Sequence, residues 1–172
     1  AEVGRYETAV EARRRLAALD PDDQRRQVAL AAALCVAGQR LEAAQVYRKA
    51  AEKATRRDAA QYLVHASGCL IEANEIDGAC VVLQEALDVA ATSPQLLFDV
   101  ALDVSRLYEK AGMPERRRDV LKLAFEAGGR TNLSITLEWI NLLLARGDVS
   151  RAGEAAAETV DCWQREDQYR DL

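Results

Sequence analysis

Five residues that tolerate a left-handed backbone recur along this chain at nearly constant spacing. They are Gly4, Gly38, Asn74, Gly112 and Gly147, which are separated by 34, 36, 38 and 35 residues. Glycine adopts positive φ without steric cost, and asparagine tolerates it better than most other residues. Between these positions apolar residues recur at intervals of three and four, which predicts helices. We therefore expect one helical hairpin copied in tandem along the chain.

The clearest copy covers residues 33–50. An apolar helical segment ends at Gly38, and a second segment follows in which Ala43, Tyr47 and Ala50 share one face. Proline and capping residues then place helix starts along the chain, because proline is tolerated in the first helical turn. The expected hairpins are 22–54, 57–91, 94–127 and 131–165, within one repeat domain over residues 1–172.

The two ends of the chain differ from these hairpins. Residues 5–19 match a second helix without a first helix, because the spacing of Gly4 and Ala9 repeats that of Gly38 and Ala43. We therefore expect the chain to begin in mid-repeat, as a section cut from a longer array. The polar residues 166–172 are expected to fray.

Composition supports an all-α fold. Hydrophobic residues make up 49% of the chain but aromatic residues only 5%, and alanine supplies much of the difference. Alanine has the highest helix propensity and allows helices to pack closely. Alternating runs rich in Val, Ile and Thr, which are typical of strands, are missing. Arginine supplies 19 of the 23 basic residues, which favours a GC-rich bacterial source.

The order of small and large residues resembles the tetratricopeptide repeat. In the first copy Leu30, Ala31 and Leu34 precede the turn and Ala43 and Tyr47 follow it, at the positions where the family has Leu, Gly, Tyr, Ala and an aromatic residue. Three further copies keep this phase, so the resemblance covers nearly the whole chain. It implies a right-handed superhelix of about nine helices, whose concave surface is lined mainly by the first helix of each hairpin.

Two residues depart from the family pattern. In the family a small residue late in the first helix faces a small residue early in the second, so that the two axes approach closely. Ala31 and Ala43 fit this rule, but Arg117 and Ile140 stand where small residues belong. We expect the third and fourth hairpins to be splayed or packed differently.

The resemblance also implies which side chains point into the concave surface. Their mixture of small, apolar and charged types suits an extended peptide or a partner helix. Some family members grip a C-terminal carboxylate with Lys and Asn at set inward positions, which here hold Val28, Ala32 and His65, so this clamp is absent. The expected partner-binding residues are Arg25, Val28, Ala32, Gln61, His65, Glu72, Asp99, Asp103, Arg106, Lys110, Glu138 and Asn141, and the other inward positions are Ala29, Val36, Gly68 and Ser134.

Residues that carry chemistry are sparse. His65, the only histidine, could bond a ligand in the groove or act as a general base, but general base catalysis needs positioned partners that the sequence does not provide. A polar residue on a solvated face is the simpler interpretation. We find no phosphate-binding glycine loop, no metal-ligand spacing and no nucleophile motif, so we expect no enzymatic activity and no cofactor.

Charge and cysteine content limit the partners and the compartment. The net charge is −5, and the arginine runs at 13–15 and 116–118 have acids close by, so no nucleic-acid surface is expected. Cys35, Cys69, Cys80 and Cys162 lie in apolar helical patterns, where cysteine behaves as a small hydrophobe. A disulfide or a reactive thiol is the alternative. No run of about 18 apolar residues occurs, so we expect a soluble chain without a membrane span. No signal peptide is visible, but a chain that begins in mid-repeat would have lost one, so the compartment, cytoplasm or periplasm, stays open.

Three functions compete at this point. The first is a non-enzymatic scaffold that binds a protein or peptide in the concave groove. The second is a spacer or assembly section of a longer array, for example in a bacterial secretion or envelope complex, which self-associates through its repeat ends. The third is an enzyme or small-molecule sensor that uses the charged end of the groove.

Overall fold

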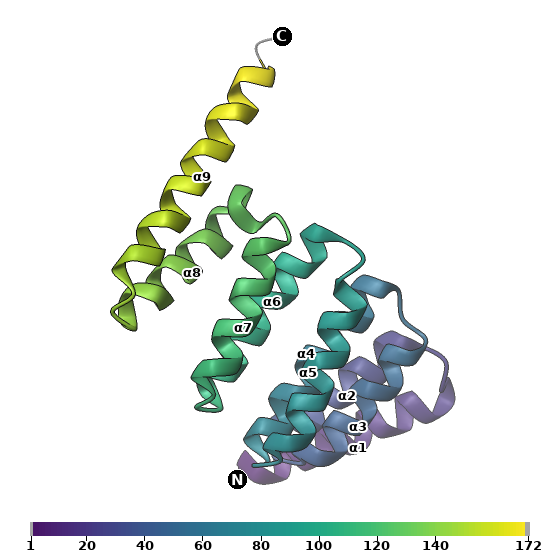
Figure 1. Cartoon of the computed structure of the whole chain (residues 1–172). Coiled ribbons are helices and arrows are strands. Elements are labelled where there is room, and N and C mark those ends of the chain that lie inside the picture. The colour runs from purple at the N-terminus through teal and green to yellow at the C-terminus, as the bar shows by residue number, and fades with distance from the viewer. Residues whose placement is uncertain (1, 171–172) are drawn as a thin grey trace. The chain divides into compact units, whose positions relative to one another are not determined.

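The computed structural model describes the backbone of residues 2–170 and the side chains of residues 6–165 (Figure 1). These residues form nine α-helices and one short 3-10 helix, and none of the described residues lies in a strand. The expected all-α repeat of helical hairpins is therefore confirmed. The chain consists of two compact units, Ala1–Ala91 and Thr92–Leu172, called here unit 1 and unit 2.

Unit 1 contains two helical hairpins and, before them, one helix that belongs to neither hairpin. Helix α1 packs on α2, α2 forms a hairpin with α3, and α4 packs on α3 while it forms a second hairpin with α5. The helices of unit 1 are α1 (Glu2–Leu19), α2 (Gln24–Val36), α3 (Arg40–Glu52), α4 (Arg56–Glu72) and α5 (Ile76–Ala90).

Unit 2 contains two further hairpins. Helix α6 packs on α7, and α8 packs on both α7 and α9. The 3-10 helix η1 joins the two hairpins. The elements of unit 2 are α6 (Pro94–Lys110), α7 (Pro114–Glu126), η1 (Gly129–Thr131), α8 (Leu133–Ala145) and α9 (Val149–Arg170).

Each hairpin turns through one residue with a left-handed backbone. Four of the five expected turns are confirmed, at Gly38, Asn74, Gly112 and Gly147, with φ between 63° and 79°. In the first, the N–H of the residue after Gly38 donates to the carbonyl of Leu34 at 2.9 Å, which satisfies a helix-terminal carbonyl. The expected turn at Gly4 is wrong. Helix α1 already begins at Glu2, so the backbone at Gly4 is helical.

Side-chain caps fix several helix starts. Thr55 and Asp58 form a reciprocal pair at the start of α4, in which Thr55 accepts from the N–H of Asp58 and donates its hydroxyl to the Asp58 carboxylate. Asn132 accepts from the N–H of Ile135 at 3.2 Å to cap α8. At α2 the cap is Asp23, whose carboxylate accepts from the backbone N–H groups of Arg25 and Arg26. The helix therefore starts after the turn that contains Pro21.

Small residues form the seam inside each hairpin of unit 1. Ala31 and Ala43 are fully buried in the first hairpin, and Ser67 and Ala79 are buried in the second. Unit 2 differs at both expected positions. Arg117 faces the buried Ser105, and Ile140 is half-buried instead of fully enclosed. The local packing is therefore different, while a widening of these hairpins stays a prediction.

The break between α7 and α8 is tightly specified. Gly128 has φ of 111°, and a methyl group added to Gly129 would lie 2.6 Å from the carbonyl oxygen of Ala124. A side chain at residue 129 would collide with backbone, so this close approach requires glycine. The approach brings α8 against α7 and so builds unit 2.

Candidate partner-binding surface

Helix α2 presents an apolar stripe in unit 1. Val28, Ala32 and Val36 recur at intervals of four residues and so lie on one side of the helix. Val28 is half-buried, Ala32 is exposed and Val36 is 65% exposed. Arg25, at the N-terminal end of the same side, is exposed. The stripe therefore offers apolar surface to solvent, most of all at Val36.

Helix α4 presents a polar stripe. Gln61, His65 and Glu72 recur on one side of the helix and all are exposed, with the half-buried Gly68 between them. The expected positions on α2 and α4 are therefore at least partly accessible to solvent.

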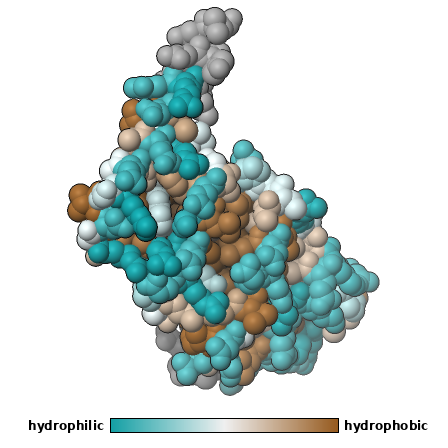
Figure 2. All heavy atoms as spheres, in the orientation of Figure 1, coloured by the Kyte–Doolittle hydropathy of each residue, from teal (hydrophilic) through white to brown (hydrophobic). Residues whose placement is uncertain are grey.

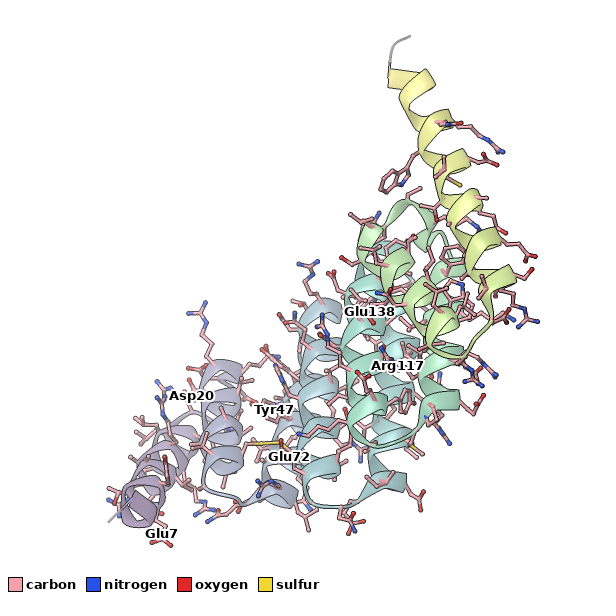
Figure 3. The ribbon with its side chains drawn as sticks, turned by 90° about the vertical axis from the view of Figure 1, so that its left-hand side faces the viewer. Glu7, Asp20, Tyr47, Glu72, Arg117 and Glu138 are labelled. Carbon is pink, nitrogen blue, oxygen red and sulfur yellow. A yellow bond between two sulfur atoms is a disulfide. The ribbon has the colours of Figure 1, made fainter. Side chains whose placement is uncertain are left out.

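A disulfide brings the two stripes together. Cys35 of α2 and Cys69 of α4 are bonded, with their Cα atoms 6.5 Å apart (Figure 3). Cys35 lies one turn after Ala32, and Cys69 lies one turn after His65, so the bond joins the edges of the two stripes. The interpretation of these two cysteines as unbonded small hydrophobes is wrong. Cys80 and Cys162 are not part of a disulfide, and Cys80 is buried.

Two polar side chains on α4 contact helix α3. The ring of His65 lies 5.4 Å from that of Tyr47, and Glu72 accepts from Arg40 Nε at 3.0 Å (Figure 3). Burial raises the pKa of Tyr47, so its phenol stays neutral beside His65. The partner of His65 is thus an aromatic ring, and among the described side chains no carboxylate bonds to it in the way that would orient a general base.

In unit 2 the predicted residues of α6 form a charged, exposed row. Asp99, Asp103, Arg106 and Lys110 are all exposed, and Arg106 donates to Asp103 at 3.2 Å. These residues recur at intervals of three and four, so they share one side of α6.

Arg117 links helix α6 to helix α8. Its guanidinium donates to Glu138 at 3.1 Å, to Glu109 at 2.5 Å and to the hydroxyl of Ser105 at 3.4 Å (Figure 3). Glu138 is therefore held by Arg117, one of the residues that breaks the repeat pattern. The sequence marked Arg117 as a packing anomaly but gave no sign of this network, because its three partners come from two other helices.

Helix α8 exposes more apolar surface than we expected from the sequence. Asn141 is exposed as expected, and Leu133, Leu137 and Leu144, on the same side, are each about half exposed. The spacing of these leucines could have revealed the stripe, since 133, 137, 141 and 144 share one helix face.

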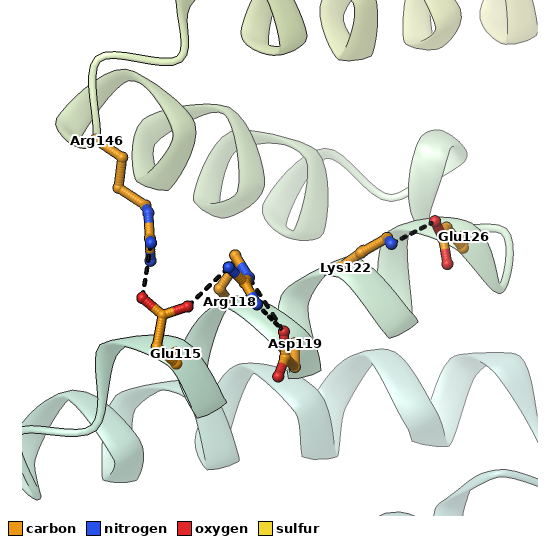
Figure 4. Close-up of polar contacts among 6 residues, drawn as sticks. All are labelled: Glu115, Arg118, Asp119, Lys122, Glu126 and Arg146. Atoms are coloured by element: carbon orange, nitrogen blue, oxygen red, sulfur yellow. Dashed lines mark hydrogen bonds and ion pairs between the residues drawn. The ribbon is translucent and has the colours of Figure 1, made fainter.

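Charged pairs dominate the second helices. On α7, Glu115 accepts from Arg118 and from Arg146, the residue that follows α8, each at 2.7 Å, and Lys122 pairs with Glu126 at 3.7 Å (Figure 4). Two open clefts lie beside such pairs, one of about 690 Å³ between α3 and α5 and one of about 490 Å³ between α7 and α9. Arg48 and Glu85 pair in the first cleft, and Arg130 and Glu158 pair in the second.

Other kinds of site are not evident in the part of the chain that is described. No group of three or more His, Cys, Asp or Glu residues there could hold a metal ion. No helix in the described part of the chain has both the length and the apolarity needed to cross a bilayer.

Comparisons with known proteins identify the fold. No protein-family model matches the sequence, and no curated protein matches it either. Solved structures do match. The kinesin light chain TPR-like repeats of Podosopora anserina align over 95% of this chain and 89% of theirs, at 15% identity and a TM-score of 0.62. MamA aligns over 96% of this chain and 93% of its own, at 13% identity and a TM-score of 0.57. BtubC from P. vanneervenii aligns over 95% of this chain and 72% of its own, at 18% identity and a TM-score of 0.56. At these identities the likeness concerns the fold, and the chain therefore has the helical-repeat architecture of tetratricopeptide-like proteins.

Proposed function

We propose that this chain is a non-catalytic scaffold that binds a protein partner through the first helices of its hairpins. The observation that carries the proposal is the paired surface of α2 and α4 in unit 1. There an exposed apolar stripe lies beside a polar stripe, and the disulfide joins the two. Repeat folds commonly use such surfaces to hold extended peptides or helices.

The chemistry of the two stripes indicates the kind of peptide that fits. Val28, Ala32 and Val36 offer a shallow apolar strip, while Gln61 and His65 offer hydrogen-bonding groups on the other side. A bound segment would therefore present aliphatic side chains to α2 and polar groups to α4. In unit 2 the charged row of α6 and the side chains of Glu138 and Asn141 supply the corresponding contacts.

A peptide selection tests this proposal even though the natural partner is unidentified. Random peptides displayed on phage would be selected on the whole chain and then assayed on two variants. Val36→Glu places a charge on the α2 stripe, and Val81→Glu is a matched control, because Val81 on α5 is 59% exposed. We expect selected peptides to bind Val36→Glu at least tenfold more weakly and Val81→Glu unchanged. If the selected peptides bind Val36→Glu with the same affinity as the native chain, the binding surface lies elsewhere.

A broader substitution covers both units. Alanine at Arg25, His65, Asp103, Arg106 and Glu138 together should weaken a natural partner as well. Unchanged affinity in this variant would contradict the assignment of binding to the first helices.

Assembly through a repeat end is a second candidate function. It is favoured by the outer side of the α8–α9 hairpin, where several large apolar side chains are exposed. This function does not depend on the groove in unit 1.

A further inference from the structure

The hairpin of α8 and α9 exposes a continuous apolar surface, called here the outer face. On α8 it contains Leu133, Leu137, Ile140 and Leu144, and on α9 it contains Val149, Gly153, Ala156, Val160 and Trp163. Ile140 is half-buried. The other large side chains are between 39% and 67% exposed, and they are Leu133, Leu137, Leu144, Val149, Val160 and Trp163. On the side of the molecule shown in Figure 2, the region where Figure 1 places α9 is mainly hydrophilic, with a few separate brown side chains at its left edge.

Helix geometry places both stripes on one side of the hairpin. The hydroxyls of Thr136 and Thr159 lie 3.5 Å apart and mark the seam between the two antiparallel helices. Counted at 100° per residue, the stripes of α8 and α9 lie to the same side of that seam. The opposite side carries the buried Ile135, Trp139 and Ala155, which face the interior of unit 2. The two stripes therefore form one surface.

This surface carries no charge. The charged residues of α9 that are described, such as Arg151, Glu154 and Glu158, fall on the opposite side of the helix. Arg151 pairs with Asp148, and Glu158 pairs with Arg130 at 2.6 Å. A single-sided distribution of this kind is typical of a helix that is covered on its apolar side.

Unit 1 shows what covers the corresponding positions. Counted from the hairpin turn, Ala44, Tyr47 and Ala51 of α3 occupy the sixth, ninth and thirteenth positions after Gly38, and all are buried in unit 1, where α4 packs on α3. The same positions after Gly147 are Gly153, Ala156 and Val160. The outer face thus has the pattern of a helix-covered surface, since Gly153 and Val160 are exposed and Ala156 is half-buried at positions that are buried in α3.

We propose that the outer face pairs with the outer face of a second copy of this chain, with the two α9 helices antiparallel about a two-fold axis at Ala156. This arrangement deepens the assembly function and is independent of groove binding. It sets Trp163 of one copy opposite Val149 of the other, and it places Val160 one residue out of register with Gly153. Gly153 suits this arrangement, because a methyl group added there would meet nothing within 4 Å of its own chain.

A second copy fits for two reasons. A surface without charges can meet its own image without like-charge repulsion, and a two-fold axis uses the same patch on both partners. The six exposed side chains present on the order of 600 Å², so pairing would cover roughly 1,200 Å², which reaches the range of specific protein interfaces. An exposed patch of this size is at the upper end of what monomers carry.

Light scattering across concentration tests the pairing. We expect the mass of the whole chain to rise from 18.9 kDa toward twice that value as concentration increases. Val160→Glu should weaken the dimer at least tenfold, because each copy would bury an unpaired carboxylate. Val81→Glu is the control, since it places the same charge on an exposed valine of unit 1 and should leave the mass curve unchanged. A native chain that stays monomeric up to millimolar concentration overturns the proposal.

Cysteine cross-linking tests the axis itself. Ala156→Cys should form an intermolecular disulfide rapidly, because both copies place residue 156 at the two-fold axis. Glu154→Cys, exposed on the opposite side of α9, should cross-link at least tenfold more slowly. Equal rates for the two variants would reject this interface. If dimers persist in Val160→Glu, the contact lies elsewhere and the proposal is likewise wrong. Binding of groove-selected peptides, measured on the same samples, shows whether the groove functions whatever the outcome for the dimer.

Discussion

The two units join their helices by different means. In unit 1 the seam between α2 and α3 consists of Ala31 and Ala43, which are fully buried, and a disulfide adds a covalent link between α2 and α4. In unit 2 the corresponding seam of α6 and α7 holds Ser105 and Arg117, and charged hydrogen bonds extend from it to α8. Unit 1 therefore relies on close apolar contact, and unit 2 relies on partners for one long polar side chain.

The difference shows what the repeat requires at this position. A small residue is one solution, because it lets two helices approach. A long side chain is another, provided that its charged end leaves the seam and finds acceptors. Arg117 meets this condition, since its side chain is only 21% exposed but reaches Glu109 and Glu138.

Removing the disulfide should give the largest effect and should act on unit 1 alone. Its loop spans 34 residues, for which chain entropy predicts a loss of about 3–4 kcal/mol when Cys35 and Cys69 are both replaced by serine. Both tryptophans lie in unit 2. We therefore expect the part of the circular dichroism signal that comes from unit 1 to unfold at a lower urea concentration. The transition followed by tryptophan fluorescence, which reports on unit 2, should keep its midpoint.

The free cysteine Cys162 offers the control for this variant. Cys162→Ser should leave both transitions unchanged. A thiol assay on the unsubstituted chain, unfolded in denaturant, should find two thiols before reduction and four after it. Four thiols before reduction, in protein kept oxidised, would contradict the disulfide.

Enlarging the seam of unit 1 should have the second largest effect. Ala31→Leu inserts three carbon atoms at a fully buried position between two helices, and such overpacking costs about 1–3 kcal/mol. Ala32→Leu is the matched control, because Ala32 is exposed on the same helix, and it should change the unfolding free energy by less than about 0.5 kcal/mol. Equal effects in the two variants would show that the seam is not tightly packed.

Removing the charge of Arg117 should cost less. Arg117→Met keeps much of the side-chain volume but leaves the buried hydroxyl of Ser105 with one partner fewer, so we expect a loss of about 1 kcal/mol in the tryptophan transition. Combining it with Ser105→Ala should recover part of that loss. A double variant whose loss equals the sum of the two single losses would indicate that the two residues do not act together.

The charged pairs on the surface of α7 should matter least. Glu115→Gln removes the acceptor shared by Arg118 and Arg146, which are both partly exposed (Figure 4). Exposed pairs contribute about 0–1 kcal/mol, and salt screens them. The difference in midpoint between this variant and the native chain should therefore disappear at about 1 M salt. A difference that persists at high salt would point to a packing role for Glu115.

Regular features of the fold were predictable from the sequence, and contacts between distant helices were not. The turns at Gly38, Asn74, Gly112 and Gly147 follow from local backbone preference, so their positions could be read directly. The expected turn at Gly4 was wrong because spacing alone does not require the chain to reverse.

The candidate surface was only partly predictable for a related reason. Helix period identifies which side Val28, Ala32 and Val36 share, but it does not say which neighbouring helix lies beside them. Cys35 and Cys69 each fit an apolar pattern, and only their placement on α2 and α4 brings the sulfur atoms together. Their separation of 34 residues, close to one repeat, was the one signal in the sequence that pointed to the bond.

The disulfide also limits how far this chain can be stretched. Cys35 and Cys69 close a ring that contains the whole of α3 and most of α4. If the two ends of the chain were pulled apart, those 34 residues would not be stretched, because the force would pass through the disulfide. Roughly 115 Å of extension would then be withheld until the bond was reduced. In a longer array under tension, the disulfide would limit the extension of this segment until it was chemically reduced.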